Sequence, residues 1–266
     1  MSGDLAHPVK TVTLTACRLG LALCLAPLLT FAADPTAPPD NGTDPTKVNA
    51  SAGTAAEHLG LRGGFAQDTL KCYYATPVAL GERTSLRLQL PLARNDVAGK
   101  HGFGLGDLSL KLTKVYTVTK AYGIVFSGEL SFDTAARPEL GAGQTVCKPT
   151  FVYAKFLAGG DIFAPAVVQS IGVGGRGTRA RVNSTVFDFY YVPRSTIPKL
   201  FMTLDPALSI DWEGKREFVS LAVTLGRSLG PAFGGNAQVY IKPTIFAGGE
   251  RPANWGIEVG YKVIGF

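Results

Sequence analysis

Apolar and polar residues alternate along most of the chain. Four leucines occupy every second position within residues 85–92, and the same period of two recurs over 107–118, 122–133 and 199–212. Successive side chains of a β-strand point to opposite faces, so this period is typical of strands with one apolar and one polar face. No long segment has the helical period, and the pattern therefore predicts an all-β protein.

The alternating segments are long for a soluble protein. They extend over 10 to 14 residues, whereas strands of globular proteins average about 5–6 residues. A tilted strand of about 9–11 residues crosses the hydrocarbon layer of a membrane. Aromatic residues, which favour the boundary between water and lipid, lie at the ends of several segments: Tyr116, Tyr122, Tyr190, Tyr191, Trp212 and Trp255. These features favour a membrane barrel over a soluble sandwich.

Counting back from the C-terminus gives eleven clear strands and a weaker one at 59–66. We expect the clear strands at residues 69–79, 84–93, 106–118, 122–133, 144–157, 161–173, 179–193, 198–212, 216–228, 236–248 and 255–266. Single-chain bacterial barrels have an even number of strands, which favours 12 here, with 10 as the alternative. The prediction is a transmembrane antiparallel up-and-down β-barrel over residues 59–266.

The lengths of the connections agree with a barrel. The longest ones, 95–103 and 135–144, fall on one side of the membrane and most of the short turns fall on the other. Long loops outside and short turns inside are typical of outer-membrane barrels. The exception is residues 229–235, a longer turn on the side of the short ones.

The last predicted strand ends in a phenylalanine. A closed barrel pairs its last strand with its first, because this pairing removes both edges of the sheet. The terminal aromatic resembles the signal that the barrel-assembly machinery recognises in bacterial outer-membrane proteins, and Tyr261, Ile264 and Phe266 are its candidate residues. Ile264 and Phe266 share the parity of Lys262 and not that of the apolar stripe. Either a bulge near Gly265 changes the face, or the last residues leave the strand.

Two segments precede the predicted barrel. Residues 19–32 form an apolar run that follows basic residues and ends in small ones, which predicts a cleaved signal peptide over residues 1–32. This run is too short to span a bilayer as a helix. Residues 33–58 begin with a stretch that is rich in Pro, Asp, Asn and Thr. Such a composition has little to bury, so we expect a disordered periplasmic leader over residues 33–58.

Charged residues on the polar faces of the strands are the candidates for lining a pore. They are Arg87, Lys111, Glu129, Asp205, Asp211, Lys242, Glu258 and Lys262. Both signs occur equally often, so we expect no strong field of one sign in the lumen. A barrel of 12 strands lies between small barrels that side chains fill and large ones that hold an open channel. These residues therefore line a narrow pore or form a solvated structural network.

The sequence offers little for catalysis or for metal binding. His58 and His101 remain after removal of the signal peptide, and neither has a partner at the spacing of metal ligands. Cys72 and Cys147 are far apart, and we expect both to be free thiols. Basic residues exceed acidic ones by 26 to 20 but do not cluster, so nucleic acid is not an expected partner. We expect no metal and no cofactor.

Two stretches resemble a known family. Residues 71–93 and 102–116, the second of which contains the G-x-G-D string that ends at Asp107, are similar to the transporter family labelled meta-pathway phenol degradation. The resemblance implies an exported outer-membrane β-barrel and a role in the transport of aromatic compounds. It supplies no catalytic residues.

The leading hypothesis is a passive channel for small, aromatic or hydrophobic solutes in the outer membrane of a Gram-negative bacterium. Its expected partners are outer-membrane lipid, the barrel-assembly machinery and a small-molecule solute. One alternative is a lipid-modifying enzyme in which His101 acts with Ser85 or Ser109, but the parity of both serines points them into the barrel. A structural or adhesive barrel is the other alternative.

Overall fold

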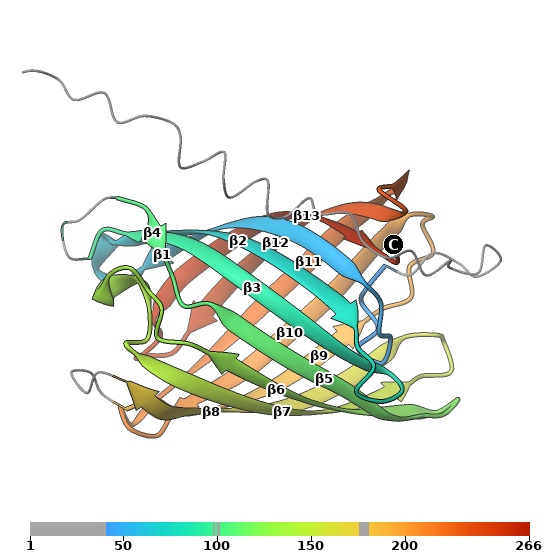
Figure 1. The fold of residues 1–266 in the computed structure, drawn as a ribbon, viewed down its shortest axis with the longest axis horizontal. Coiled ribbons are helices and arrows are strands. Elements are labelled where there is room, and N and C mark those ends of the chain that lie inside the picture. Colours follow the sequence, from blue (N-terminus) through green and yellow to red (C-terminus); the bar gives the residue numbers. More distant parts are fainter. Residues whose placement is uncertain (1–40, 98, 100–101, 176–180) are drawn as a thin grey trace, which may run out of the picture.

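The computed structural model describes residues 41–97, 99, 102–175 and 181–266. Twelve long antiparallel strands form a closed barrel (Figure 1). The strands are β1 (Ser51–Leu61), β2 (Ala66–Pro77), β3 (Thr84–Asn95), β5 (Ser109–Val118), β6 (Tyr122–Ser131), β7 (Gln144–Phe156), β8 (Ile162–Gly175), β9 (Asn183–Val192), β10 (Leu200–Asp211), β11 (Arg216–Ala232), β12 (Gly235–Ala247) and β13 (Ala253–Ile264). The predicted 12-stranded up-and-down barrel is confirmed.

Three short elements supplement the barrel. Strand β4 (Gly104–Leu105) pairs with the end of β3, and two 3-10 turns, η1 (Arg62–Gly64) and η2 (Pro138–Leu140), lie in connections. Neither of these turns, the only helical elements among the described residues, is long and apolar enough to cross a membrane.

The barrel closes through β1, which pairs with β13 on one side and with β2 on the other. The sequence pattern placed this strand at 59–66 and extended the disordered leader to residue 58, and both predictions are wrong. The inward and outward positions of β1 are mostly small residues, so no apolar stripe marks it. Gly53 shows why, since a Cβ there would lie 2.7 Å from the ring of Tyr73, which covers this part of β1.

Large apolar side chains cover the outside of the barrel. Leu88, Leu112, Phe126, Leu225, Ile241 and Val259 all have exposed side chains at alternate positions. The opposite positions point into the lumen and include the buried polar residues Thr69, Ser109, Thr203 and Glu258. An apolar exterior with a polar interior is the arrangement of a barrel that crosses a lipid bilayer. Tyr190, which the sequence pattern placed at the membrane boundary, instead points into the lumen.

The connections separate by length as the sequence predicts. We call the end where β1 begins and β13 ends the terminal end, and the opposite end the loop end (Figure 1). The long connections after β3 and β6 lie at the loop end. The expected exception at 229–235 is absent, because β11 continues to Ala232 and β12 begins at Gly235. Phe233 and Gly234 have positive φ values of 51° and 80°, as a two-residue hairpin turn requires.

The last two residues leave the strand. Strand β13 ends at Ile264, which is buried, and Gly265 has a φ of 75°. This left-handed conformation turns the chain, so the second of the two predicted alternatives is correct. The ring of Phe266 then stacks at 6.4 Å on that of Tyr74, on the outer face of β2. Tyr74 pairs with Ala52 and Ala52 with Val263, so Phe266 joins three strands at the closing seam.

Carboxylates organise the turns between strands. In the turn before β8, Asp161 accepts hydrogen bonds from the Tyr191 hydroxyl at 2.6 Å and from the Arg194 backbone N–H at 2.8 Å. The bond from Tyr191, followed by that from Arg194, lowers the pKa of the Asp161 carboxyl.

Cys72 and Cys147 are both free thiols. The predicted signal peptide, residues 33–40 of the predicted leader, and His101 lie outside the described residues.

Candidate functional site

A row of charged side chains crosses one wall of the lumen. Arg87, Lys111, Glu129 and Lys148 are directly paired in register on the neighbouring strands β3, β5, β6 and β7. We call them the basic row, because three cations and one anion leave two positive charges in excess. Lys148 Nζ lies 2.9 Å from Glu129 Oε1, so this pair is neutral as a unit. The excess belongs to Arg87 and Lys111.

Arg87 and Lys111 have different surroundings. The guanidinium of Arg87 lies 4.1 Å from the centre of the Tyr73 ring and donates a hydrogen bond to Gln89 Oε1 at 2.9 Å. These contacts hold Arg87 against the wall. The Lys111 ammonium has no hydrogen bond or ion pair with another described residue. Lys111 is therefore the cation of the row that is free to meet a solute.

An ionic cluster joins the strands at the closing seam. Glu57 on β1 and Glu258 on β13 are directly paired, and two like charges at such positions repel. Lys71 on β2 lies between them, with its Nζ at 2.8 Å from each carboxylate. Tyr240 on β12 donates a hydrogen bond of 2.9 Å to the other oxygen of Glu258. We call Glu57, Lys71, Tyr240 and Glu258 the seam cluster.

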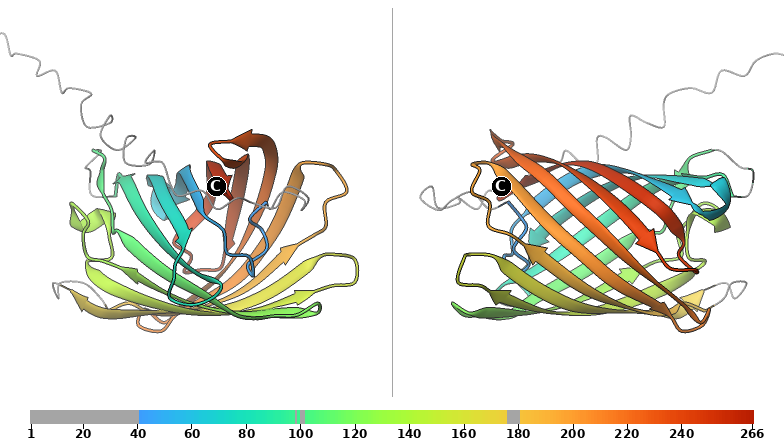
Figure 2. Two further views of the ribbon diagram at one scale, coloured as in Figure 1. Left: turned by 45° about the vertical axis from the view of Figure 1, so that its right-hand side comes forward. Right: turned by 180° about the vertical axis from the view of Figure 1, so that it is seen from behind.

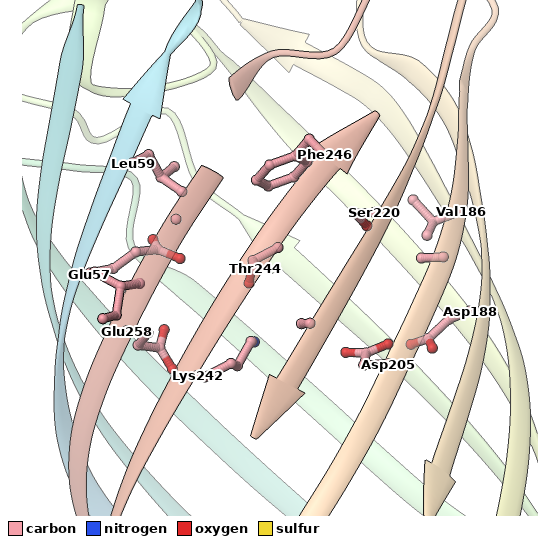
Figure 3. A pocket seen from close by; sticks show the side chains of 14 residues that line it. Glu57, Leu59, Val186, Asp188, Asp205, Ser220, Lys242, Thr244, Phe246 and Glu258 are labelled. Atoms are coloured by element: carbon pink, nitrogen blue, oxygen red, sulfur yellow. The ribbon is translucent and has the colours of Figure 1, made fainter. Parts of the chain in front are cut away.

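Two aspartates form a second acidic group in the lumen. Asp188 on β9 and Asp205 on β10 point their carboxylates toward one another, and Lys242 lies across the cavity from them, near Glu258 (Figure 3). No ion pair between described residues includes either aspartate. The Oδ1 atom of Asp188 is buried and accepts no hydrogen bond from a described residue. Such a buried acceptor is costly unless water or a ligand supplies a donor.

Two cavities of about 260 Å³ each lie in the lumen. The acidic cavity is lined by Glu57, Asp188, Asp205, Lys242 and Glu258, together with neutral residues (Figure 3). The mixed cavity is lined by Lys111, Glu129, Lys148, Asp188 and Tyr190, and by Pro45 and small apolar residues. Asp188 lines both cavities, so they adjoin one another. The lumen thus holds space of the size of small solutes between charged walls.

Residues 41–50 enter the lumen at the terminal end, close to the C-terminus (Figure 2). Thr43 and Thr46 are buried there, although the sequence pattern predicts a disordered leader over 33–58. Asn41 and Asp44 accept hydrogen bonds from the backbone N–H groups of Thr43 and Thr46 at 3.1 and 2.9 Å. These local turns shape the segment, which we call the lumen segment. The repeated pattern of Asn or Asp two residues before Thr is the sequence signal for them.

The wall of the barrel holds the lumen segment in place. The Tyr190 hydroxyl donates to the Thr43 carbonyl at 3.1 Å, and Lys262 Nζ donates to the Asn41 carbonyl at 3.2 Å. Gly123 provides space for the segment, because a Cβ there would lie 2.4 Å from the methyl group of Thr46. The segment therefore narrows the lumen between the mixed cavity and the terminal end of the barrel.

Asp107 organises the opposite end of the lumen. One of its carboxylate oxygens accepts hydrogen bonds from the backbone N–H groups of Thr134 and Ala135 at 3.2 and 3.1 Å, and the other from that of Ala142 at 2.6 Å. Three bonds from one connection fix residues 132–143 at the mouth. The buried Asn95 side chain donates to the carbonyl of Glu139 at 2.7 Å, which holds this connection against the inner side of β3. The G-x-G-D string of the sequence thus serves as a loop anchor.

The eight lining candidates occupy different levels of the lumen. Asp211 lies at the loop end, where its carboxylate accepts a hydrogen bond of 3.0 Å from the Gly214 N–H and stabilises a turn. Lys262 lies at the terminal end, over the ring of Phe201 at 5.3 Å. The others surround the middle of the lumen: Arg87, Lys111, Glu129, Asp205, Lys242 and Glu258. The charged lining residues that sequence reasoning missed are Glu57, Lys71, Lys148 and Asp188, and the Tyr190 side chain also lines the lumen.

Of the residues considered for lipid modification, the structure describes Ser85 and Ser109 but not His101. Ser109 is buried on the inward face of β5, opposite Ser131 and Gln89. His58 lies on the outer face, with its Nδ1 at 2.7 Å from Asp68 Oδ1 and its ring at 5.2 Å from that of Trp255. No serine, threonine or cysteine bonds to His58 among the described residues. Within the described ranges there is also no cluster of side chains suited to a metal.

Neither a protein-family model nor a curated protein matches the chain. Solved structures do resemble it. An outer membrane channel from Pseudomonas putida F1 is similar with a TM-score of 0.68 at 13% identity, over 86% of this chain and 100% of that one. The NanC porin is similar with a TM-score of 0.55 at 10% identity, over 80% of this chain and 98% of that one. At these identities the likeness shows the fold, and the link to phenol degradation stays a prediction.

Proposed function

We propose that the chain is an outer-membrane channel through which small solutes diffuse passively. The observation that carries this proposal is the lumen: an apolar closed barrel surrounds two adjoining cavities with charged walls instead of a packed core. A barrel that served only as an anchor would be expected to fill this space with side chains or a plug. The descriptions of the two similar structures, an outer membrane channel and a porin, support the same function.

The proposed orientation follows the lengths of the connections. The terminal end with its short turns faces the periplasm, and the loop end faces the outside of the cell. The predicted signal peptide supports export to this membrane. Solutes enter beside the connection that Asp107 anchors and leave past the lumen segment.

The proposed solutes are small, because the cavities are about 260 Å³ each and the lumen segment narrows the terminal end. The resemblance of residues 71–93 and 102–116 to the phenol-degradation family supports aromatic or hydrophobic compounds. Aliphatic side chains such as Val152 and Val168 in the mixed cavity offer them an apolar surface.

Planar-bilayer recording of the purified protein tests the proposal. The intact barrel is expected to conduct ions in small, discrete steps, and a small aromatic solute such as benzoate is expected to reduce the current reversibly. A variant that lacks residues 41–48 removes the lumen segment and serves as the open reference. Absence of current from both proteins, with folding verified by circular dichroism, would contradict a channel.

A further inference from the structure

Opposite charges stand at the two ends of the mixed cavity. Lys111 lies on β5 and Asp188 on β9, and both line this one space. Strands β6, β7 and β8 separate them, so the two backbones are four strand spacings of about 4.8 Å apart along the wall. Even with both side chains extended toward each other, a gap of several ångströms is left between the two charges. A solute that contacts both must therefore carry its own charges at separated positions.

Neither end group takes part in an ion pair between described residues. The Lys111 ammonium also makes no hydrogen bond with another described residue. Asp188 Oδ1 is buried without a donor, and the carboxyl group of Asp205 lies beside that of Asp188 (Figure 3). A carboxylate of a solute would pair with Lys111, and an ammonium would supply the donor that Asp188 lacks.

The wall between the two ends carries an apolar patch beside Thr150 and the ion pair of Glu129 with Lys148. Val152 on β7 and Ala164, Ala166 and Val168 on β8 line the cavity between the charged residues. The lysine in this stretch, Lys148, is already paired with Glu129 at 2.9 Å. The cavity therefore combines a cationic end, a middle with an apolar patch beside one neutralised ion pair, and an anionic end.

We infer that the mixed cavity is a binding site for an elongated zwitterion, a small solute with an ammonium and a carboxylate at opposite ends of an apolar body. The ammonium lies at Asp188 and the carboxylate at Lys111. This inference rests on the proposed channel function and gives the class of solute that the lumen selects. An α-amino acid fits poorly, because its two charges are adjacent.

Two isomers provide the test. 4-(Aminomethyl)benzoate carries its charges at opposite ends of a ring, whereas phenylglycine has the same atoms with adjacent charges. Benzylamine and 4-methylbenzoate each lack one charge. Isothermal titration calorimetry on the full barrel in detergent is expected to show 4-(aminomethyl)benzoate binding about tenfold more tightly than each of the other three.

Two substitutions assign the ends. Asp188→Asn should reduce the affinity for 4-(aminomethyl)benzoate to that for 4-methylbenzoate, and Lys111→Gln should reduce it to that for benzylamine. Glu213→Gln and Lys120→Gln make the same changes of charge in exposed turns and should leave the affinity unchanged. Circular dichroism of each variant shows whether it is folded.

Three results would overturn the inference. They are equal affinities for the two isomers, equal affinity for benzylamine and the zwitterion, and an unchanged affinity in either variant. Equal binding of benzylamine would assign a site for simple cations at Asp188 and Asp205 instead. Calorimetry does not depend on conduction, so a barrel that binds the zwitterion but passes no current would contradict the proposed channel and not the site.

Discussion

The hydroxyl of Tyr190 on β9 donates a hydrogen bond of 3.1 Å to the carbonyl of Thr43, and this contact ties the lumen segment to the barrel wall. Tyr190→Phe removes this bond, together with the contact of the same hydroxyl with the Thr203 side chain. The bond to Thr43 is worth about 1 kcal/mol, and its loss shifts the balance between docked and released segment about fivefold. We expect a higher mean single-channel conductance. Tyr191→Phe is the matched control, because its hydroxyl bonds to Asp161 outside the lumen.

Deletion of residues 41–48 should raise the conductance further, because it removes most of the lumen segment, whereas Tyr190→Phe weakens only the attachment of the segment. If neither this deletion nor Tyr190→Phe changes the conductance, the lumen segment does not limit the flow of ions.

The strands could be predicted because residues on the outside of the barrel face lipid and must therefore be apolar. Leu112 and Val259 obey this rule on distant strands, and the alternation is visible without any knowledge of the fold. Strand β1 lacks the pattern because large side chains of a neighbouring strand leave room only for small residues on it. The ring of Tyr73 over Gly53 is an example. Its existence depends on pairing with β2 and β13, which no local pattern encodes.

The site was predicted less completely than the fold. The alternation along each strand is enough to identify Lys111 and Glu258 as inward-facing. The ion-pair partners of inward side chains depend in addition on the register between strands and on the level of each residue along the barrel axis. Glu57 was missed because its strand was assigned to the leader. The lumen segment could not be found from composition, since its order comes from tertiary contacts such as that of Lys262 with Asn41.

A pair of adjacent positions tests which face of β5 meets lipid. Leu112 is exposed on the outer face, whereas Thr113 points into the lumen. Leu112→Arg should lower the free energy of unfolding by about 2–4 kcal/mol, and Thr113→Arg should lower it much less. Urea titration of the barrel in phospholipid vesicles measures both values. Equal losses at the two positions would mean that the two faces are alike and that the barrel does not sit in lipid as described.

Removal of the cation from the seam cluster should weaken the closure of the barrel. Lys71→Met leaves Glu57 and Glu258 as directly paired like charges, each with an oxygen that loses a contact of 2.8 Å. The expected loss in the free energy of unfolding is about 3 kcal/mol, less where lumen water screens the charges.

A second substitution shows whether the charge is the cause. Lys71→Met combined with Glu57→Gln should recover part of the loss, because the repulsion is then absent. Lys120→Met changes an exposed lysine in the same way and should have little effect. A double variant as unstable as Lys71→Met alone would assign the loss to packing instead of charge.

The anchor at the loop end controls access from outside. Asp107→Ala removes the acceptor of three backbone N–H groups and should release residues 132–143. Hydrogen exchange of Thr134, Ala135 and Ala142 is expected to become faster, while exchange in the strands is unchanged. Glu213→Ala, in an exposed turn at the same end of the barrel, is the control. Unchanged exchange at these three amides would show that the connection is held by other contacts, such as that of Asn95 with Glu139.

The charges of the lumen predict weak ion selectivity with a defined response to substitution. Among the described wall residues at the middle and the terminal end of the lumen, six are basic and five are acidic, a difference of one: Lys71, Arg87, Lys111, Lys148, Lys242 and Lys262 against Glu57, Glu129, Asp188, Asp205 and Glu258. Replacement of Arg87 and Lys111 by glutamine removes two positive charges and reverses this balance. In a narrow lumen of low effective dielectric constant, the double variant should therefore prefer cations.

Reversal potentials in a gradient of potassium chloride measure the preference, and the opposite pair of substitutions provides the check. Asp188→Asn with Asp205→Asn should move the reversal potential toward that of an anion-selective pore, because it removes the negative charge of the aspartate pair from the facing wall. Lys120→Gln, in an exposed turn at the terminal end, should leave it unchanged. Lys111 meets the lumen without a partner, whereas Arg87 is held by Tyr73, so Lys111→Gln alone should account for most of the shift. A reversal potential that moves for neither pair would mean that ions pass through the barrel without approaching these walls, and the two cavities would then not lie on the path.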